Sequence, residues 1–158
     1  YFFESYNKQR FQEATGMNVS FVQDNESNSQ FGTIRGLHMQ TGEESQAKLV
    51  RVVKGKVKDV VIDVRPESPS YKEKFEIELT EDNKTQLFVP RGFLHGFSVL
   101  SRNVIFSYKC DNHYDKKSES GVNPLDQSLN INWRLSKKDF LISDKDKMLI
   151  DFKSFCLT

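Results

Sequence analysis

Short apolar runs follow one another through the middle of the chain, and several of them alternate apolar with polar residues. Val, Ile and Phe at every second position are typical of β-strands with one buried face. On this pattern we expect strands at 19–25, 35–40, 47–55, 56–65, 74–79, 85–92, 95–100 and 103–110. Turn-forming pieces such as RPESPS and TEDNK separate these runs, which favours antiparallel pairing.

Helical signals are confined to the two ends. The segment NKQRFQEATG is polar, lacks proline and finishes on Gly16, a residue that often ends a helix. From about Ser118 the pattern decays into a polar tail, in which we expect a short helix near 146–152. Together these signals predict one all-β domain over residues 1–158, a sandwich or barrel with a short N-terminal helix and a short C-terminal helical tail.

Composition narrows the class of protein. The 158 residues carry 23 basic and 22 acidic side chains, so no general polyanion-binding surface is predicted. Cys110 and Cys156 lack metal-type spacing, and as free thiols they suit a reducing cytosol. No apolar run approaches the roughly 20 residues of a membrane span. The sequence begins at Tyr1 without an initiator Met, and we expect further residues upstream.

Polar residues interrupt one expected strand at RGLHMQ, which places His38 near Arg35. Residues three apart on a regular strand point to opposite faces. Gly36 lies between them, where a bulge could re-aim one of the two side chains toward the other. If one site uses both residues, we therefore expect a bulge at Gly36.

A second histidine, His95, lies in VPRGFLHGF. Pro90 can close a strand, and Gly92 permits a tight bend. The spacing Pro-x-Gly-x-x-His resembles the second motif of the cupin superfamily of small β-barrels. Metal-binding cupins also carry a His-x-His pair, whereas Met39 and Gln40 follow the first histidine here. The pattern thus favours a cupin barrel and gives no support for a metal site.

Two further strands carry isolated polar groups. Lys48 opens the apolar run KLVRVV, and Tyr108 follows Val104 and Phe106 at period two, so its ring shares their face. Taken singly, each of these residues has a structural explanation: a satisfied core histidine, a core tyrosine, or a solvated lysine at a strand end. Taken together with the family resemblance described next, they favour a shared functional site.

Seven strings of the chain resemble the dTDP-4-dehydrorhamnose 3,5-epimerase family, in the family's order and nearly its spacing. They are FFESY, FVQDN, IRGLHMQ, QAKLVRVVKGKVKDVVIDVRPESPSY, LFVPRGFLHGFSVL, YKCDNHY and ISDKD, and they extend from Tyr1 to about Lys147. The resemblance implies a cupin-type jelly-roll β-barrel, a homodimer whose N-terminal region reaches the partner's site, and a nucleotide-sugar substrate. It implies no metal and no redox cofactor.

The resemblance also assigns roles to individual residues. His38 would be the catalytic base, Asp146 its carboxylate partner, Tyr108 the opposing acid, and Lys48 a cation near the sugar carbonyl. The substrate-binding positions are Arg35 at the diphosphate, His95 in the sugar pocket, Tyr114 stacked on thymine, and the nucleotide-sugar contacts Glu4, Gln23, Asn25 and Glu119. The chain departs from the family at Met39, where members commonly have tyrosine, and it lacks an expected diphosphate-binding arginine, which would lie upstream of Tyr1.

The implied chemistry is cofactor-independent epimerisation of a 4-keto-6-deoxy sugar. C3 and C5 flank the C4 carbonyl, so their protons are acidic enough for a histidine to remove near neutral pH. Inversion then needs an acid on the opposite face, and a preorganised cation at the enolate oxygen can contribute roughly 3 kcal/mol.

Two alternatives remain at this point. A catalytically inert cupin would bind the same ligand but need no His–Asp pair opposite a tyrosine. A 3-epimerase would use the same base and acid at one carbon only. The sequence also leaves open which nucleotide and which final sugar are involved.

Overall fold

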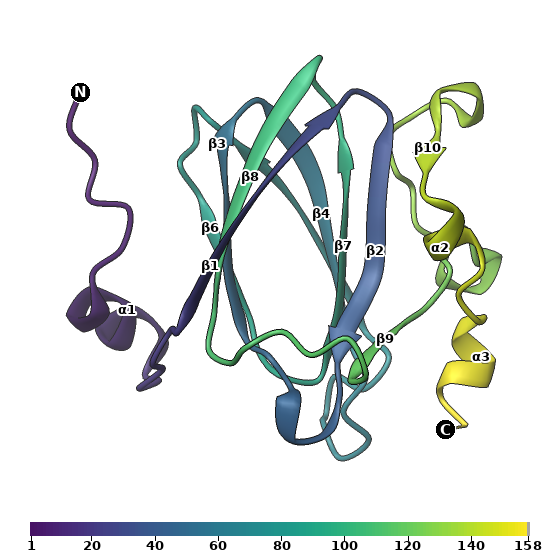
Figure 1. Cartoon of the computed structure of the whole chain (residues 1–158), viewed down its shortest axis with the longest axis horizontal. Helices are drawn as coiled ribbons and strands as arrows, with labels where there is room; N and C mark the ends of the chain where they lie inside the picture. The colour runs from purple at the N-terminus through teal and green to yellow at the C-terminus, as the bar shows by residue number, and fades with distance from the viewer. Residues whose placement is uncertain (158) are drawn as a thin grey trace.

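The computed structural model describes residues 1–157, and two sheets packed face to face form its centre (Figure 1). The helices are α1 (Lys8–Thr15), α2 (Asp144–Lys147) and α3 (Phe152–Phe155), with short 3-10 turns at Gly42–Glu44, Gln127–Leu129 and Lys137–Asp139. The strands are β1 (Gln23–Gln30), β2 (Thr33–Gln40), β3 (Lys48–Lys54), β4 (Lys56–Asp63), β5 (Lys74–Thr80), β6 (Gln86–Val89), β7 (Phe93–Val99), β8 (Asn103–Cys110), β9 (Glu119–Gly121) and β10 (Leu141–Ile142). None of the helices within residues 1–157 is long and apolar enough to cross a membrane.

The strands divide between a four-stranded sheet, in the order β1-β8-β3-β6, and a six-stranded sheet, in the order β10-β2-β7-β4-β5 with β9 also paired to β2. The main ladders are antiparallel, and the short β10 runs parallel to β2. This arrangement confirms the predicted all-β fold.

Two apolar clusters explain why some strands are continuously apolar and others alternate. One cluster fills the space between the sheets and includes Val57, Val61 and Phe106. The other lies on the outer face of the six-stranded sheet, where the C-terminal tail covers Val60 and Ile62. Strand β4 is thus buried on both faces, and its run VVID has no exposed side.

The N-terminal helix forms as predicted. The Asn7 side chain accepts a hydrogen bond from Arg10 N at its start, and Gly16 ends it with φ = 70°. Phe11 then packs edge-on against Phe88 of β6, with ring centroids 5.1 Å apart. Figure 1 shows α1 outside the four-stranded sheet, on the side opposite the C-terminal tail.

Several boundaries differ from the sequence prediction. Strand β1 begins at Gln23 instead of residue 19 and continues through the polar stretch to Gln30, because its backbone pairs with β8 along its whole length. Strands β9 and β10, of three and two residues, are too short to show a periodic pattern and were missed. The helix expected at 146–152 is two short helices, α2 and α3, on either side of an extended bridge at Ile150.

Candidate active site

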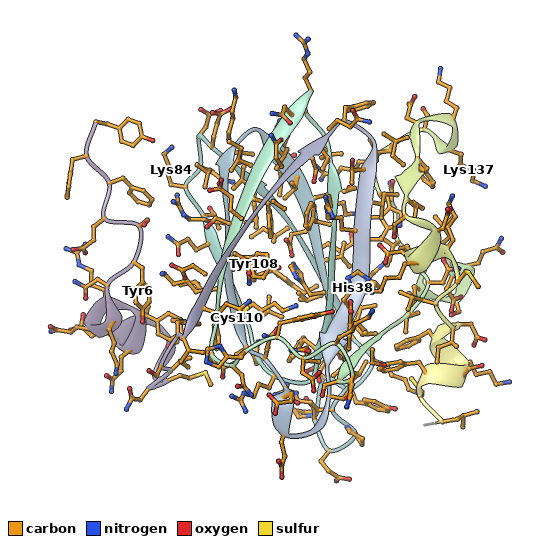
Figure 2. The ribbon with its side chains drawn as sticks, viewed as in Figure 1. Tyr6, His38, Lys84, Tyr108, Cys110 and Lys137 are labelled. Atoms are coloured by element: carbon orange, nitrogen blue, oxygen red, sulfur yellow. The ribbon has the colours of Figure 1, made fainter. Side chains whose placement is uncertain are left out.

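A cavity of about 600 Å³ opens between the two sheets, and a smaller one of about 240 Å³ adjoins it. His38, Lys48 and Tyr108 line both. His38 comes from the six-stranded sheet, whereas Lys48 and Tyr108 come from the four-stranded sheet. Figure 2 shows His38 and Tyr108 on these facing walls. The cavity therefore has an imidazole on one side and a phenol and a lysine side chain on the other.

The position of His38 depends on an irregularity in β2. The register between β2 and β7 shifts between Arg35 and His38, and Gly36 within this stretch has φ = 115°. The expected bulge at Gly36 is thus confirmed, and the side chains of Arg35 and His38 both line the larger cavity. A side chain at Gly36 would collide with the neighbouring strand, since a Cβ there would lie 2.6 Å from Gly96 Cα and 2.7 Å from His95 O.

Asp146 is the hydrogen-bond partner of the His38 ring. The His38 Nε2–Asp146 Oδ1 distance is 2.6 Å, and Gly36 N donates to Asp146 Oδ2 at 3.4 Å. Ser143 caps α2 and accepts from Asp146 N. Burial acts to raise the pKa of Asp146, but the hydrogen bonds from His38, Gly36 and Ser143 outweigh it and leave the pKa below its ordinary value. Asp146 is therefore an ionised partner that orients the imidazole.

On the opposite wall, Lys48 Nζ lies 5.9 Å from the centroid of the Tyr108 ring. Burial lowers the pKa of Lys48, while Cys110, Asp59 and Glu119 act to raise it. Burial has the opposite effect on Tyr108 and raises the pKa of its phenol, so the hydroxyl keeps its proton at neutral pH. The wall thus presents the Lys48 amine and a protonated phenol to a ligand in the cavity.

His95 is the cross-strand partner of His38 and lines the same cavity at 8% exposure. Its Nε2 lies 3.0 Å from each carboxylate oxygen of Asp59, a fully buried residue of β4. Sequence reasoning did not single out Asp59. The signal was present, because a carboxylate inside the apolar run of β4 needs a buried partner.

The smaller cavity gathers four of the predicted nucleotide-sugar contacts: Gln23, Asn25, Tyr114 and Glu119. Glu119 accepts from Tyr114 Oη at 2.8 Å and pairs with Lys145 Nζ at 2.7 Å. Lys145 also lines the larger cavity. It was missed from the sequence, although it immediately precedes Asp146 and must lie close to the same site.

Arg35 and Glu4 occupy different surroundings. Arg35 lines the larger cavity, and its Nε donates to Ser29 Oγ at 3.0 Å. Glu4 lies outside the four-stranded sheet, 3.4 Å from Arg10 of α1, and lines neither of the two adjoining cavities. The structure therefore brings together every predicted site residue except Glu4. Within residues 1–157, no group of three or more His, Cys, Asp or Glu side chains is placed to hold a metal ion.

Comparisons with known proteins identify the family. The family described as dTDP-4-dehydrorhamnose 3,5-epimerase matches residues 1–154. The dTDP-4-dehydrorhamnose 3,5-epimerase of Shigella flexneri is 47% identical over 146 residues, which cover 92% of this chain and 80% of that protein.

Solved structures give the same result. The crystal structure of dTDP-4-dehydrorhamnose 3,5-epimerase from Elizabethkingia anophelis has a TM-score of 0.92 and 48% identity, covering 97% of this chain and 84% of that one. A dTDP-6-deoxy-D-glucose-3,5-epimerase from Legionella pneumophila, in complex with dTDP-4-keto-L-rhamnose, has a TM-score of 0.91 and 41% identity, covering 96% and 80%. The fold is thus the cupin jelly roll, and the chain belongs to the dTDP-4-dehydrorhamnose 3,5-epimerase family.

Proposed function

We propose that this protein is an isomerase that inverts C3 and C5 of a dTDP-linked 4-keto-6-deoxy sugar, converting dTDP-4-dehydro-6-deoxy-glucose to dTDP-4-dehydrorhamnose. The observation that carries the proposal is the His38–Asp146 pair, 2.6 Å apart, facing Tyr108 from the opposite sheet. A binding protein has no need of this arrangement, which therefore disfavours the inert cupin. Membership of an epimerase family supports the same conclusion.

In the proposed reaction His38 removes the proton from C5 or C3. The C–H electron pair forms the enolate double bond, and the carbonyl electrons move to the C4 oxygen. Lys48 stabilises that oxyanion, an electrostatic contribution of several kcal/mol where donors are preorganised. Tyr108 then protonates the carbon from the other face, and the resulting phenolate and imidazolium return to their starting states by proton exchange with solvent.

Asp146 contributes by position and charge. It fixes the imidazole tautomer and stabilises the imidazolium once this forms. Its lowered pKa keeps it ionised at neutral pH, so it can play this part throughout the reaction. Neither proton transfer changes an oxidation state, so no redox cofactor takes part in the proposed steps.

The rest of the site suits an anionic nucleotide sugar. Arg35 and Lys145 line the larger cavity and supply positive charge for a diphosphate. Tyr114 and the amides of Gln23 and Asn25 line the adjoining cavity and suit a base and its ribose. The Legionella relative binds a dTDP-linked 4-keto sugar, which supports the same ligand class here. The free thiols of Cys110 and Cys156 are consistent with the proposed location in a reducing cytosol.

Incubation of the protein with dTDP-4-keto-6-deoxyglucose in D₂O tests the proposal directly. Each inversion must place one solvent deuteron on the inverted carbon, so NMR should find deuterium at both C3 and C5 of a product with the rhamno configuration. Deuterium and inversion at C3 alone would instead identify a 3-epimerase. Binding without any exchange would overturn the catalytic assignment and favour the inert cupin.

A further inference from the structure

A row of hydrogen bonds runs along one wall of the smaller cavity. Tyr114 N donates to Gln23 Oε1 at 3.1 Å, Gln23 Nε2 donates to Asn25 Oδ1 at 3.0 Å, and Asn25 Nδ2 donates to Cys110 Sγ at 3.7 Å. Gln23, Asn25 and Tyr114 all line the cavity. Cys110 lies behind them, with no exposed surface. The row thus joins a buried thiol to the residues proposed to bind the nucleotide.

The row has one direction. A backbone N–H can only donate, so Tyr114 requires the oxygen of Gln23, whose NH₂ group must then face the oxygen of Asn25. Asn25 consequently presents its own NH₂ to position 110, where an acceptor is needed. The Cys110 sulfur is a weak acceptor that fulfils this need. Because both amide oxygens already accept within the row, the remaining N–H groups are free to donate to a ligand.

Strand pairing explains why position 110 can control this wall. Cys110 is the last residue of β8, and its cross-strand partners are Gln23 on one side and Lys48 on the other. Asn25 lies opposite Tyr108, two residues earlier on β8. Burial raises the pKa of the Cys110 thiol, so the group stays neutral beside the Lys48 side chain. The neutral thiol can therefore accept a hydrogen bond from Asn25 without forming an ion pair with Lys48, the residue proposed to stabilise the enolate.

We propose that Cys110 is a positioning residue for nucleotide binding, which ends the Tyr114–Gln23–Asn25 row with a buried acceptor and so fixes the orientation of the two amides. The proposal rests on the proposed function, because it takes these amides to contact the nucleotide. Cys110 touches neither the sugar nor the reacting atoms in this role. Its loss should weaken nucleotide binding and leave the proton transfers intact.

Three replacements separate this role from simple packing. Cys110→Ala removes the acceptor, Cys110→Val removes it while filling the space, and Cys110→Ser keeps an acceptor oxygen. Loss of one hydrogen bond predicts a rise of about 3- to 10-fold in KM and in the Kd for dTDP for the Ala and Val variants, with kcat within about twofold of the unmodified protein. The Ser variant should restore both constants. Cys156→Ala, at the other free and partly buried thiol, is the matched control and should change neither.

A double-mutant cycle tests whether Cys110 acts through Asn25. In an Asn25→Ala background, Cys110→Ala should add little further loss of dTDP affinity, because the group that it orients has gone. Fully additive losses, an unchanged dTDP affinity in both the Ala and Val variants, or a kcat that falls with KM unchanged would each overturn the proposal. Calorimetry with dTDP needs no turnover. Failure of the unmodified protein to epimerise the sugar would therefore count against the proposed function, whereas the dTDP affinities of the variants would still test the role of Cys110.

Discussion

The residues proposed to catalyse proton transfer lie on opposing sheets, and this separation decides what each can do. His38 and its partner Asp146 are on the side of the six-stranded sheet, and Tyr108 is on the four-stranded sheet. A base and an acid on opposite faces of a sugar ring can invert a carbon, whereas one group on one face can only exchange its proton. The two roles can therefore be separated by mutation.

Replacing His38 with Ala should abolish both inversion and deuterium uptake at C3 and C5, because no other group is proposed to start the reaction. Removal of a general base typically costs about 10²- to 10⁴-fold in rate. Tyr108→Phe keeps the base, which can return a proton to the face it came from. This variant should retain exchange at a carbon beside the ketone while losing inversion there. NMR of the sugar in D₂O measures both, and inversion by Tyr108→Phe at the unmodified rate would show that another group supplies the proton.

Individual site residues could be predicted where they lie within a short sequence motif. His38, Lys48, His95 and Tyr108 each lie in a short strand with a recognisable context, and the structure places all four on one cavity. Asp59 and Lys145 carried local signals, a carboxylate inside an apolar run and a position next to Asp146, but their partners, His95 and Glu119, are distant in sequence. Their contacts follow from strand register and tail packing, which no local pattern encodes.

At the scale of single elements, the bulge in β2 sets the geometry of the site. Arg35 and His38 are three residues apart, so a regular strand would point their side chains to opposite faces. The register shift in β2 brings both side chains to the same cavity. Strand β1 shows the opposite case. Its residues from Glu26 to Gln30 are all polar, because the outward side chains are exposed at the sheet edge and the inward Ser27 lines the larger cavity. Backbone pairing alone defines that strand, so its extent was not predictable.

Gly36→Ala tests the bulge. The added Cβ would meet Gly96 and His95 at a backbone φ of 115°, so we expect a loss of about 2 kcal/mol, or roughly 4–8 °C in Tm. Displacement of His38 should also lower kcat by roughly 10- to 100-fold. Gly16→Ala is the control, since its φ is 70° but no atom lies within 4 Å of the added Cβ. It should cost about 1 kcal/mol and leave kcat unchanged. Equal effects of the two variants on kcat would contradict the importance of the bulge.

At the scale of the whole molecule, the two ends of the chain lie on opposite sides of the barrel (Figure 1). The C-terminal tail covers the outer face of the six-stranded sheet and delivers Asp146 to His38, over a separation of 108 residues. The N-terminal segment lies outside the other sheet, with Tyr1 and Phe2 almost fully exposed and Glu4 away from the cavity. One end therefore completes the site of its own chain, and the other does not.

The position of Glu4 leads to the prediction that the protein is a homodimer in which Glu4 serves the partner's site. Exposed aromatic side chains at the start of the chain are suited to such a contact. Light scattering should give the mass of two chains at assay concentrations. Glu4→Gln should raise KM for the nucleotide sugar by roughly 10-fold with little change in Tm, because a charge-assisted hydrogen bond to the ligand is lost.

Mixed dimers decide whether Glu4 acts in its own chain or across the interface. A dimer of one Glu4→Gln chain and one His38→Ala chain, separated by two affinity tags, contains one intact His38. If Glu4 acts across the interface, that His38 is served by the unmodified Glu4 of the other chain, and the mixed dimer should show the KM of the unmodified protein with about half its kcat. If Glu4 acts within its own chain, the same His38 has only the altered residue, and KM should stay raised. A raised KM in the mixed dimer, or a monomer with full activity, would contradict the shared site and leave Glu4 with only its ion pair to Arg10 on the outside of the barrel.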